Sequence, residues 1–273
     1  FLFFSEDGNF NFKLLARIPT YEKTNLLNFL KKTNNKDYFN LQNIDILSKY
    51  WLEAQSKKNL EFNESFIFLK THHSLISYFG KPFTNENNTI GFIYIIRDPR
   101  DVVISWSHHN NCSINESIDF IVNSLSSTPW SVSNNSTLGK ESMPSSLISS
   151  WEENCISWTN CNFNCPKLIL RYEDIISNKE KILENIINFF KTNFGFNFLK
   201  IQDKKNNILK STEFEVLKQN EIKKGFTETV NGRFFREGSK NQWKTRLNKE
   251  QIFRIEKCFF KIMQNYGYKT VCF

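Results

Sequence analysis

Apolar runs that stop abruptly at polar residues recur along this chain. The clearest is Phe92–Ile96, which ends at the letters RDPR and is followed by a helical apolar pattern. This pattern predicts a buried strand that leads directly into a helix, with Pro99 in the first helical turn. Arg97 then lies at the carboxyl end of the strand, where parallel sheets bind ligands, and Ser105 lies two turns into the helix. Taken alone, the segment fits a phosphate site and an ordinary surface Arg–Asp pair equally well.

Three further apolar runs of strand length occur, at residues 2–4, 66–69 and 168–171. Segments with a helical spacing of apolar positions lie between and after them. Strands that alternate with helices are typical of an α/β fold, so we predict a parallel sheet with helices on both faces. The expected helices are residues 12–18, a helix from about residue 100, 114–122, a helix that carries Trp151 and Trp158, 182–190 and 250–265, with one more helix among the turns of 201–246.

Two stretches depart from this alternation. Residues 31–64 are charged, rich in Asn and only weakly helical, and residues 123–150 are dominated by Ser and Asn. The second stretch can bury little apolar surface, so we expect a mobile excursion there. We predict one α/β domain over residues 1–273, because the length suits one large domain and the chain shows no internal repeat.

Polar clusters follow the predicted strands at residues 5–9, 70–73, 97–105 and 172–174. The carboxyl ends of parallel strands meet at one edge of a sheet, so these clusters should converge on one crevice.

Composition limits the classes of function. The net charge of +8 permits an anionic partner, but no block of Lys and Arg is long enough to indicate a nucleic-acid-binding arm. No apolar run approaches the ~20 residues that span a bilayer, and the first residues do not resemble a signal peptide. The six dispersed cysteines favour free thiols and a cytoplasmic protein. Cys161 and Cys165 lack a second pair at metal spacing, so no metal site is expected.

These motifs, in this order, resemble those of the sulfotransferase superfamily that uses 3′-phosphoadenosine-5′-phosphosulfate (PAPS). The resemblance runs nearly end to end, and it implies a P-loop-NTPase-like sulfotransferase fold, PAPS as co-substrate and 3′-phosphoadenosine-5′-phosphate (PAP) as product. Each motif alone is weak, but the ordered set is a strong indication. The matching segments are Lys70-Thr71-His72, Arg97-Asp98-Pro99-Arg100-Asp101 with Ser105, Trp151 and Trp158, Leu170-Arg171-Tyr172-Glu173-Asp174, Thr212-Glu213-Phe214, Arg236-Glu237-Gly238 with Gln242-Trp243-Lys244, and Tyr266-Gly267-Tyr268.

The resemblance implies a role for each matching residue on the nucleotide side. The 3′-phosphate would be held by Arg97 and Ser105, joined by Arg236 and the backbone of Gly238, because a phosphate favours a guanidinium, a hydroxyl and backbone amides. The adenine would be bordered by flat or small side chains, with core packing as the alternative role of the aromatic ones: Tyr172, Thr212 and Phe214.

His72 is the candidate general base for deprotonating a hydroxyl or amine acceptor, since imidazole titrates near neutrality. Lys70 would stabilise charge on the sulfuryl group or the leaving phosphate, and Ser105 is counted with these catalytic residues. The alternative for His72 is a polar residue at a strand end, and His73 is the second candidate base.

The N-terminal loop departs from the family pattern. The family has Tyr-Pro-Lys/Arg-Ser-Gly-Asn/Thr-Thr-Trp as its phosphosulfate-binding loop, and here Gly8 and Asn9 fit while Glu6 and Asp7 replace the cation and the serine. Carboxylates facing a phosphosulfate would repel it.

Three accounts follow from this departure: an active enzyme in which Lys70 or Lys13 supplies the cation, an impaired enzyme that binds PAPS or PAP, or a non-catalytic binding protein. A kinase-like reaction would need a Gly-x4-Gly-Lys-Ser/Thr loop, which the chain lacks. The expected acceptor is a small molecule or a glycan, and the sequence leaves the oligomeric state open.

Overall fold

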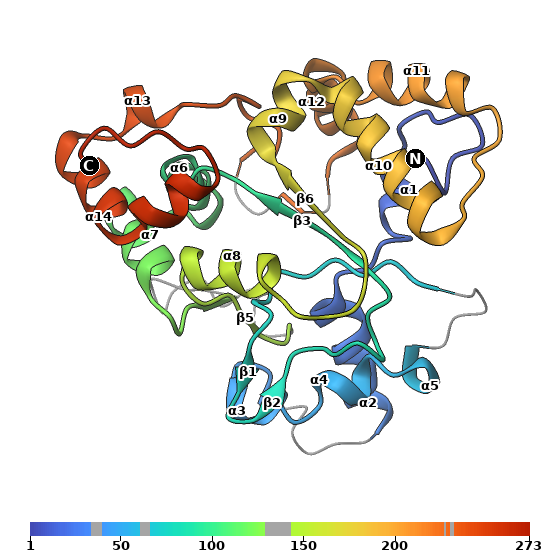
Figure 1. Cartoon of the computed structure of the whole chain (residues 1–273), viewed down its shortest axis with the longest axis horizontal. Helices are drawn as coiled ribbons and strands as arrows, with labels where there is room; N and C mark the ends of the chain where they lie inside the picture. Colours follow the sequence, from blue (N-terminus) through green and yellow to red (C-terminus); the bar gives the residue numbers. More distant parts are fainter. Residues whose placement is uncertain (34–39, 61–65, 129–142, 227, 230–231) are drawn as a thin grey trace.

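The centre of the fold is a pair of parallel strands. The computed structural model describes residues 1–33, 40–60, 66–128, 143–226, 228–229 and 232–273. Within them β3 (Phe92–Ile96) pairs with β6 (Lys167–Arg171), and Ile96 lies opposite Arg171 (Figure 1). The predicted α/β class with a parallel sheet is therefore confirmed. Two shorter antiparallel pairs join β1 (Ser77–Tyr78) to β2 (Lys81–Pro82) and β4 (Ser127–Thr128) to β5 (Ser146–Leu147).

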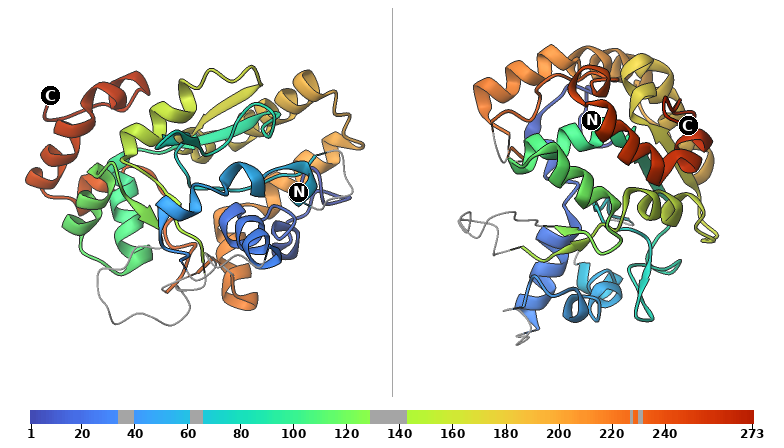
Figure 2. Two further views of the ribbon diagram at one scale, coloured as in Figure 1. Left: turned by 90° about the horizontal axis from the view of Figure 1, so that it is seen from below. Right: turned by 90° about the vertical axis from the view of Figure 1, so that its left-hand side faces the viewer.

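Helices lie on both sides of the β3–β6 pair. α8 (Trp151–Thr159) contacts β3, whereas α9 (Tyr172–Ser177) and α10 (Lys179–Phe194) contact β6. A second group of helices gathers at one end of the molecule, away from the N-terminal helices (Figures 1 and 2). This group consists of α6 (Pro99–Asn110), α7 (Ile114–Val122), α13 (Trp243–Arg246) and α14 (Lys249–Asn265).

The other helices come from the two ends of the chain. The N-terminal ones are α1 (Phe12–Leu15), the π-helix η1 (Glu22–Leu26), α2 (Leu27–Lys32), α3 (Ile44–Leu47), α4 (Trp51–Ala54) and α5 (Lys57–Leu60). Two more, α11 (Ile201–Ser211) and α12 (Phe214–Lys224), lie together with α13 within residues 201–246, where only one helix was expected. The expected helix over 12–18 is shorter than predicted, because it ends at Leu15.

Two predicted strands do not join the sheet, and this corrects the sequence prediction. Residues 2–4 form a turn, and residues 66–69 are extended without strand pairing. Aromatic rings explain why these apolar runs are buried without forming a ladder: the Phe3 ring lies 4.7 Å from that of Phe190 and 4.8 Å from that of Phe68. Such tilted and edge-on ring pairs stabilise the segments without inter-strand hydrogen bonds.

The predicted mobile excursion is only partly within the described residues. Its central part, residues 129–142, lies outside them. On either side of that part β4 pairs with β5, and Ser145, Ser146 and Ser149 are buried. The described flanks are therefore packed, while mobility of the centre and the single-domain organisation stay predictions.

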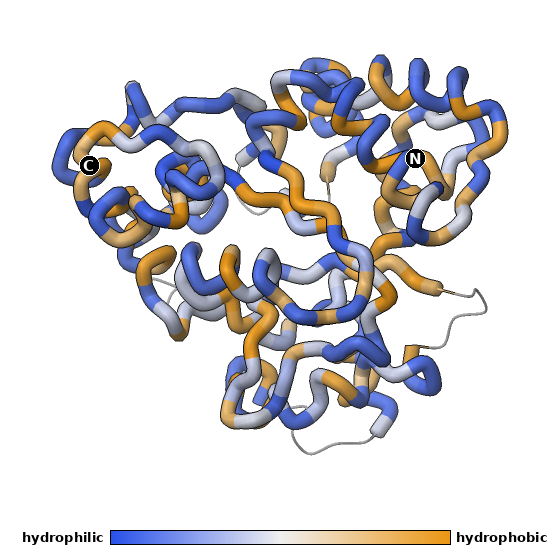
Figure 3. The backbone as a smooth tube through the Cα atoms, viewed as in Figure 1, coloured by the Kyte–Doolittle hydropathy of each residue, from blue (hydrophilic) through white to orange (hydrophobic). Residues whose placement is uncertain are grey.

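A small hydrophobic cluster packs Leu2 against α10 and α11, and two larger clusters hold the other elements together. One surrounds Ile255 and Met263 of α14, and the other surrounds Trp51; Tyr94 of β3 contacts both. β3 and β6 appear as the apolar stretch at the centre of Figure 3. The opposite face of β3 is less covered, since Ile93 and Ile95 remain 37% and 55% exposed.

A buried ionic network ties α6 to α14. The Arg100 guanidinium, 2% exposed, donates to Asp98 Oδ2 at 2.7 Å and to Glu256 Oε1 at 2.5 Å, and it stacks on Trp243. Glu256 also accepts the backbone N–H groups of Val271 and Cys272. Each charge in this network has partners, so removal of one member leaves the others buried and unpaired.

We expect Glu256→Gln to lower the free energy of unfolding by about 3 kcal/mol or more, because it leaves the buried Arg100 partly unpaired. Urea unfolding followed by circular dichroism measures this change. The matched control is Asp119→Asn, which removes a surface partner of Arg254 on the same helix and should cost about 1 kcal/mol or less. Equal effects of the two substitutions would show that the Arg100 network does not stabilise the fold.

Candidate functional site

A cavity of about 3200 Å³ opens at the carboxyl ends of β3 and β6. Ligand pockets usually measure ~300–1000 Å³, so this one has room for a nucleotide and a second substrate. Eleven residues were predicted for the site, and all but Gly8 and Asn9 line this cavity. Those that line it are Lys70, His72, Arg97, Ser105, Tyr172, Thr212, Phe214, Arg236 and Gly238.

Arg97 is presented to the cavity by the ends of the two parallel strands. Because Ile96 pairs with Arg171, the next residues of the two strands, Arg97 and Tyr172, are also neighbours. The Arg97 guanidinium lies over the Tyr172 ring at 4.3 Å, and its buried Nε has no hydrogen-bond partner among the described residues. Trp151 fixes the backbone by donating from Nε1 to the Arg97 carbonyl at 3.1 Å. A stacked guanidinium with an unused donor suits an anionic ligand.

The RDPR turn is shaped by its own side chains. Asp98 is the N-cap of α6: its Oδ1 accepts the Arg100 N–H at 3.0 Å, and Pro99 is the first helical residue. The Asp98 N–H in turn donates to Glu173 Oε1 at 3.0 Å, which joins the ends of β3 and β6. This local order turns Arg100 inward and leaves Arg97 and the exposed Ser105 on the cavity side.

Asp101 attaches a distant loop to α6. Its carboxylate accepts the Asn241 N–H at 2.8 Å and the Trp243 N–H at 3.0 Å. Burial raises the pKa of Asp101, and these two hydrogen bonds oppose that shift. Arg236 and Gly238 precede the attached residues, so this contact brings them to the wall that holds Arg97.

Gly238 is required by a close aromatic contact. Its φ is +57°, and a Cβ added there would lie 2.1 Å from the Phe214 ring. The ring therefore lies directly on the loop backbone, and no larger residue fits without displacing one of them. Thr212 begins the same wall, and Lys179 Nζ donates to its carbonyl at 2.7 Å.

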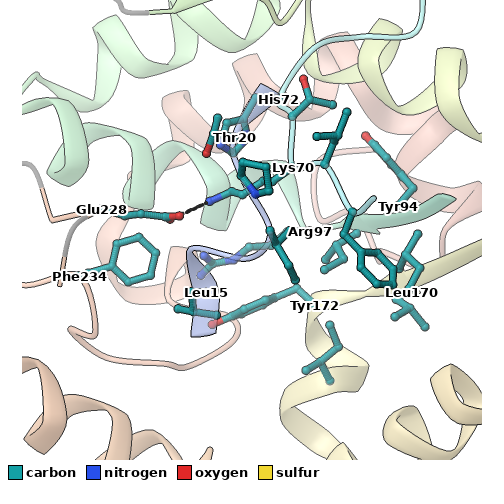
Figure 4. A pocket seen from close by; sticks show the side chains of 18 of the residues that line it. Leu15, Thr20, Lys70, His72, Tyr94, Arg97, Leu170, Tyr172, Glu228 and Phe234 are labelled. Carbon is teal, nitrogen blue, oxygen red and sulfur yellow. Dashed lines mark hydrogen bonds and ion pairs between the residues drawn. The ribbon is translucent and has the colours of Figure 1, made fainter. Parts of the chain in front are cut away.

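Lys70 and His72 come from the extended segment that was predicted as a strand. Lys70 forms one parallel bridge with Thr20, in which the Tyr21 N–H donates to the Lys70 carbonyl at 2.8 Å. The Lys70 ammonium contacts both oxygens of Glu228 at 2.7 Å, and Figure 4 shows this pair beside Thr20 and His72. Glu228 was not predicted, since it lies 158 positions from Lys70 and no local pattern marks it.

His72 is neutral at physiological pH. Its residue surface is exposed to the cavity, but protein atoms surround it on the other sides. Loss of solvation lowers the pKa of His72 to about 4, and the positive charge of Lys70 is the second cause of this shift. A neutral imidazole can accept a proton, so its ionisation state suits a base, although the low pKa makes it a weak one.

His73, the second candidate base, also lines the cavity but is held by packing and by a hydrogen bond. It is 1% exposed, its Nδ1 accepts the Leu147 N–H at 3.1 Å, and its ring stacks on Phe83. Burial lowers the pKa of His73 to about 3. The structure gives it a packing role, in contrast to its neighbour His72.

The loop at residues 5–9 lies elsewhere. Gly8 packs so closely on α11 that an added Cβ would lie 2.6 Å from the Lys204 carbonyl oxygen. Asn9 donates to the Asp7 carboxylate at 2.6 Å, and Asn9 and Ser5 hydrogen bonds lower the pKa of Asp7 to about 2. Gly8 and Asn9 do not line the cavity, so their nucleotide role stays a prediction, and Glu6 and Asp7 do not line it either.

A different segment meets the cavity beside Lys70. The chain runs from Pro19 through the Thr20 bridge directly into η1, and Thr20, Lys23 and Thr24 line the cavity. Lys13 also lines it. The sequence analysis did not predict this segment as part of the site. The segment pairs with the rest of the fold through the single Thr20–Lys70 bridge, and no apolar run of strand length leads directly into Thr20.

No group of three or more His, Cys, Asp or Glu side chains suited to a metal occurs in the described part of the chain. Within the same residues, no helix combines the length and apolar character needed to cross a membrane.

Comparison with known proteins agrees with this arrangement. The mouse (Mus musculus) sulfotransferase 2A6 is 25% identical over 218 residues, which cover 77% of this chain and 68% of that protein. The guinea pig (Cavia porcellus) 3-beta-hydroxysteroid sulfotransferase is 25% identical over 228 residues, covering 79% and 70%. A rabbit (Oryctolagus cuniculus) amine sulfotransferase is 22% identical over 211 residues, covering 72% and 62%.

Solved structures share the fold. The mouse sulfotransferase SULT7A1 complexed with PAP aligns with a TM-score of 0.53 at 20% identity, covering 77% of this chain and 71% of that one. Retinol dehydratase in complex with androsterone and PAP aligns with a TM-score of 0.54 at 16% identity, covering 92% and 71%. The family model for the sulfotransferase domain matches residues 4–267, and the chain therefore belongs to the sulfotransferase domain family.

Proposed function

We propose that this chain transfers a sulfuryl group from PAPS to a hydroxyl or amine of a small acceptor, with His72 as the general base. The observation that carries the proposal is the placement of Arg97 and His72 on the wall of one cavity, although they come from separate segments. Family membership supports sulfuryl transfer in general. The cytoplasmic location and a glycan as the alternative acceptor stay predictions.

The nucleotide side of the cavity would take the 3′-phosphate and the adenine. Arg97 offers a stacked guanidinium with a free donor, and Arg236 lies on the same wall. Ser105 is exposed there and can donate a hydroxyl hydrogen bond. Tyr172 and Phe214 provide flat apolar surface for a base.

In the transfer, the acceptor oxygen or nitrogen forms a bond to sulfur while the bond from sulfur to the 5′-phosphate oxygen breaks. The acceptor proton goes to neutral His72, and the released PAP carries the additional negative charge. Lys70 would stabilise that charge, assisted by Lys23 or Lys13, which line the same cavity.

The Lys70–Glu228 pair favours a second candidate function, a protein that binds the nucleotide without turnover. In that case Glu228 would keep Lys70 away from the sulfuryl group. The two side chains are 36% and 40% exposed, and pairs this exposed contribute only about 1 kcal/mol or less. A phosphosulfate can therefore displace Glu228, and this is why we prefer the enzyme.

Calorimetry with PAP and with AMP tests the nucleotide assignment. We expect the wild type to prefer PAP, and Arg97→Ala to lose about 10–100-fold in PAP affinity with little change for AMP, because a charge-assisted phosphate contact contributes about 1.5–3 kcal/mol. Arg254→Ala, on the surface of α14, is the control. His72→Ala should retain PAP binding and lower turnover by about 10²–10⁴-fold with an acceptor panel. A wild type that does not bind PAP contradicts the proposal, and binding without any turnover supports the second candidate.

Glu228→Gln should tighten PAP binding about 2–5-fold, because Lys70 no longer has a competing carboxylate. Calorimetry measures the change. Glu215→Gln removes an equal charge from α12, where Glu215 pairs with Lys218 at 3.8 Å, and it should leave the affinity unchanged. An equal gain in both variants would show a general charge effect and not release of Lys70.

The pH dependence of kcat/KM should reflect the lowered pKa of His72. The base acts when neutral, so activity should stay level as the pH falls from 7.5 to about 5 and decline with a midpoint near 4. Glu228→Gln should move that midpoint lower, because the Glu228 charge raises the pKa of His72. Circular dichroism at each pH checks that the chain remains folded. A midpoint near 6.5, the value of a free imidazole, would contradict the lowered pKa of His72.

A further inference from the structure

Glu22 is a buried carboxylate that has no part in the reaction described above. It is the first residue of η1, is only 1% exposed and borders the same cavity as the Lys70–His72 segment. Burial raises the pKa of Glu22. Its Oε2 has no hydrogen-bond partner among the described residues. Placing a carboxylate here without a cation bound to it costs folding free energy.

Its other oxygen is the start of a short hydrogen-bond chain. The Thr71 hydroxyl donates to Glu22 Oε1 at 2.6 Å, and Thr71 Oγ1 accepts the His73 N–H at 3.0 Å. Because His73 Nδ1 accepts the Leu147 N–H, the proton of the neutral ring is on Nε2, which faces Glu22 Oε1 at 3.7 Å. Both inward side chains of the segment are thus directed at one carboxylate.

The parallel bridge explains why Glu22 reaches Thr71. The bridge pairs Thr20 with Lys70, so the residues that follow on each side approach one another. Beyond Lys70 the segment has no strand partner in the described residues. Side chains of α8 hold its backbone instead, since Asn154 donates to the His72 carbonyl and Trp158 to the His73 carbonyl. The hydrogen bond to Glu22 acts on the Thr71 side chain itself and fixes its direction.

We infer that Glu22 is a positioning residue, which holds Thr71 inward so that its two neighbours, Lys70 and His72, face the cavity. Successive side chains of an extended segment point to opposite sides, so holding Thr71 determines the direction of both. The inference rests on the proposed sulfotransferase activity, in which His72 accepts the proton. Displacement of a catalytic group by ~1 Å can cost about 100-fold in rate.

Three variants and one control test the inference. Glu22→Ala removes the acceptor, Glu22→Gln keeps an oxygen for Thr71, and Thr71→Val removes the donor. Thr84→Val is the matched control, because Thr84 is also buried and its hydroxyl contacts Thr89 away from the cavity. For each variant we would measure kcat, the KM for PAPS, Tm, and the Hε1 resonance of His72 by NMR across a pH series.

We expect Glu22→Ala and Thr71→Val to lower kcat about 10–100-fold with the KM for PAPS within twofold of wild type. The Tm of Glu22→Ala should be unchanged or higher, because an unpaired buried carboxylate is removed. Glu22→Gln should recover most of kcat, and Thr84→Val should retain it. The His72 resonance should move in Glu22→Ala and remain in Thr84→Val.

A kcat of Glu22→Ala within twofold of wild type would overturn the inference. A loss of kcat that follows a lowered Tm would also overturn it, since that result describes a purely structural residue. If the wild type shows no turnover with any acceptor, the proposed function fails, but the NMR measurement still decides the inference. An unmoved His72 resonance in Glu22→Ala then overturns it, and a moved one supports it.

Discussion

The guanidinium of Arg100 is buried between carboxylates from two distant parts of the chain, Asp98 and Glu256. A buried charge tolerates few arrangements, because every donor that loses its acceptor costs several kcal/mol. Arg100 therefore fixes how the start of α6 sits on α14. Only three positions earlier, Arg97 forms no such ion pair within the described residues and lines the cavity, with its guanidinium over the Tyr172 ring. Within the RDPR turn, Arg100 thus stabilises the fold, and Arg97 is the arginine that lines the cavity.

Carboxylates hold other segments of the site by the same means. Asp101 accepts backbone N–H groups of the loop that follows Gly238, and Glu173 accepts from Asp98 and from Tyr268. Glu221 accepts the N–H groups of Phe234 and Phe235. Backbone N–H groups in loops need an acceptor, which is otherwise water or a neighbouring strand. One buried carboxylate can accept two such N–H groups at once. These buried acidic residues thus shape the loops from inside, while Arg97 and Arg236 line the cavity together with Glu228 and Glu237.

The sequence predicts those parts of the fold whose signals are local. Phe92–Ile96 followed by a capped helix was recognised correctly, because the apolar run, the N-cap and Pro99 are adjacent. The strand at residues 66–69 was not, because its phenylalanines pack ring against ring and the backbone pairs only at Lys70. Gly8 was assigned to the nucleotide by its motif, but its position is decided by contact with Lys204, far along the chain. Glu228 could not be predicted either, since its contact is equally remote.

The loop at residues 5–9 does not line the cavity, so its carboxylates are not the ones that oppose an anionic ligand there. In the sequence, Glu6 and Asp7 stand where the family has a cation and a serine, which leaves a protein that binds without turnover as the alternative to the enzyme. In the structure, Asp7 is occupied by Asn9 and Ser5, and the wall beside Lys70 is formed by Thr20 and its neighbours. The carboxylate that does meet the catalytic groups is Glu228, which is half-exposed and paired. In the proposed reaction a phosphosulfate, which carries more than one negative charge, would compete well for Lys70, because an exposed ion pair is weak.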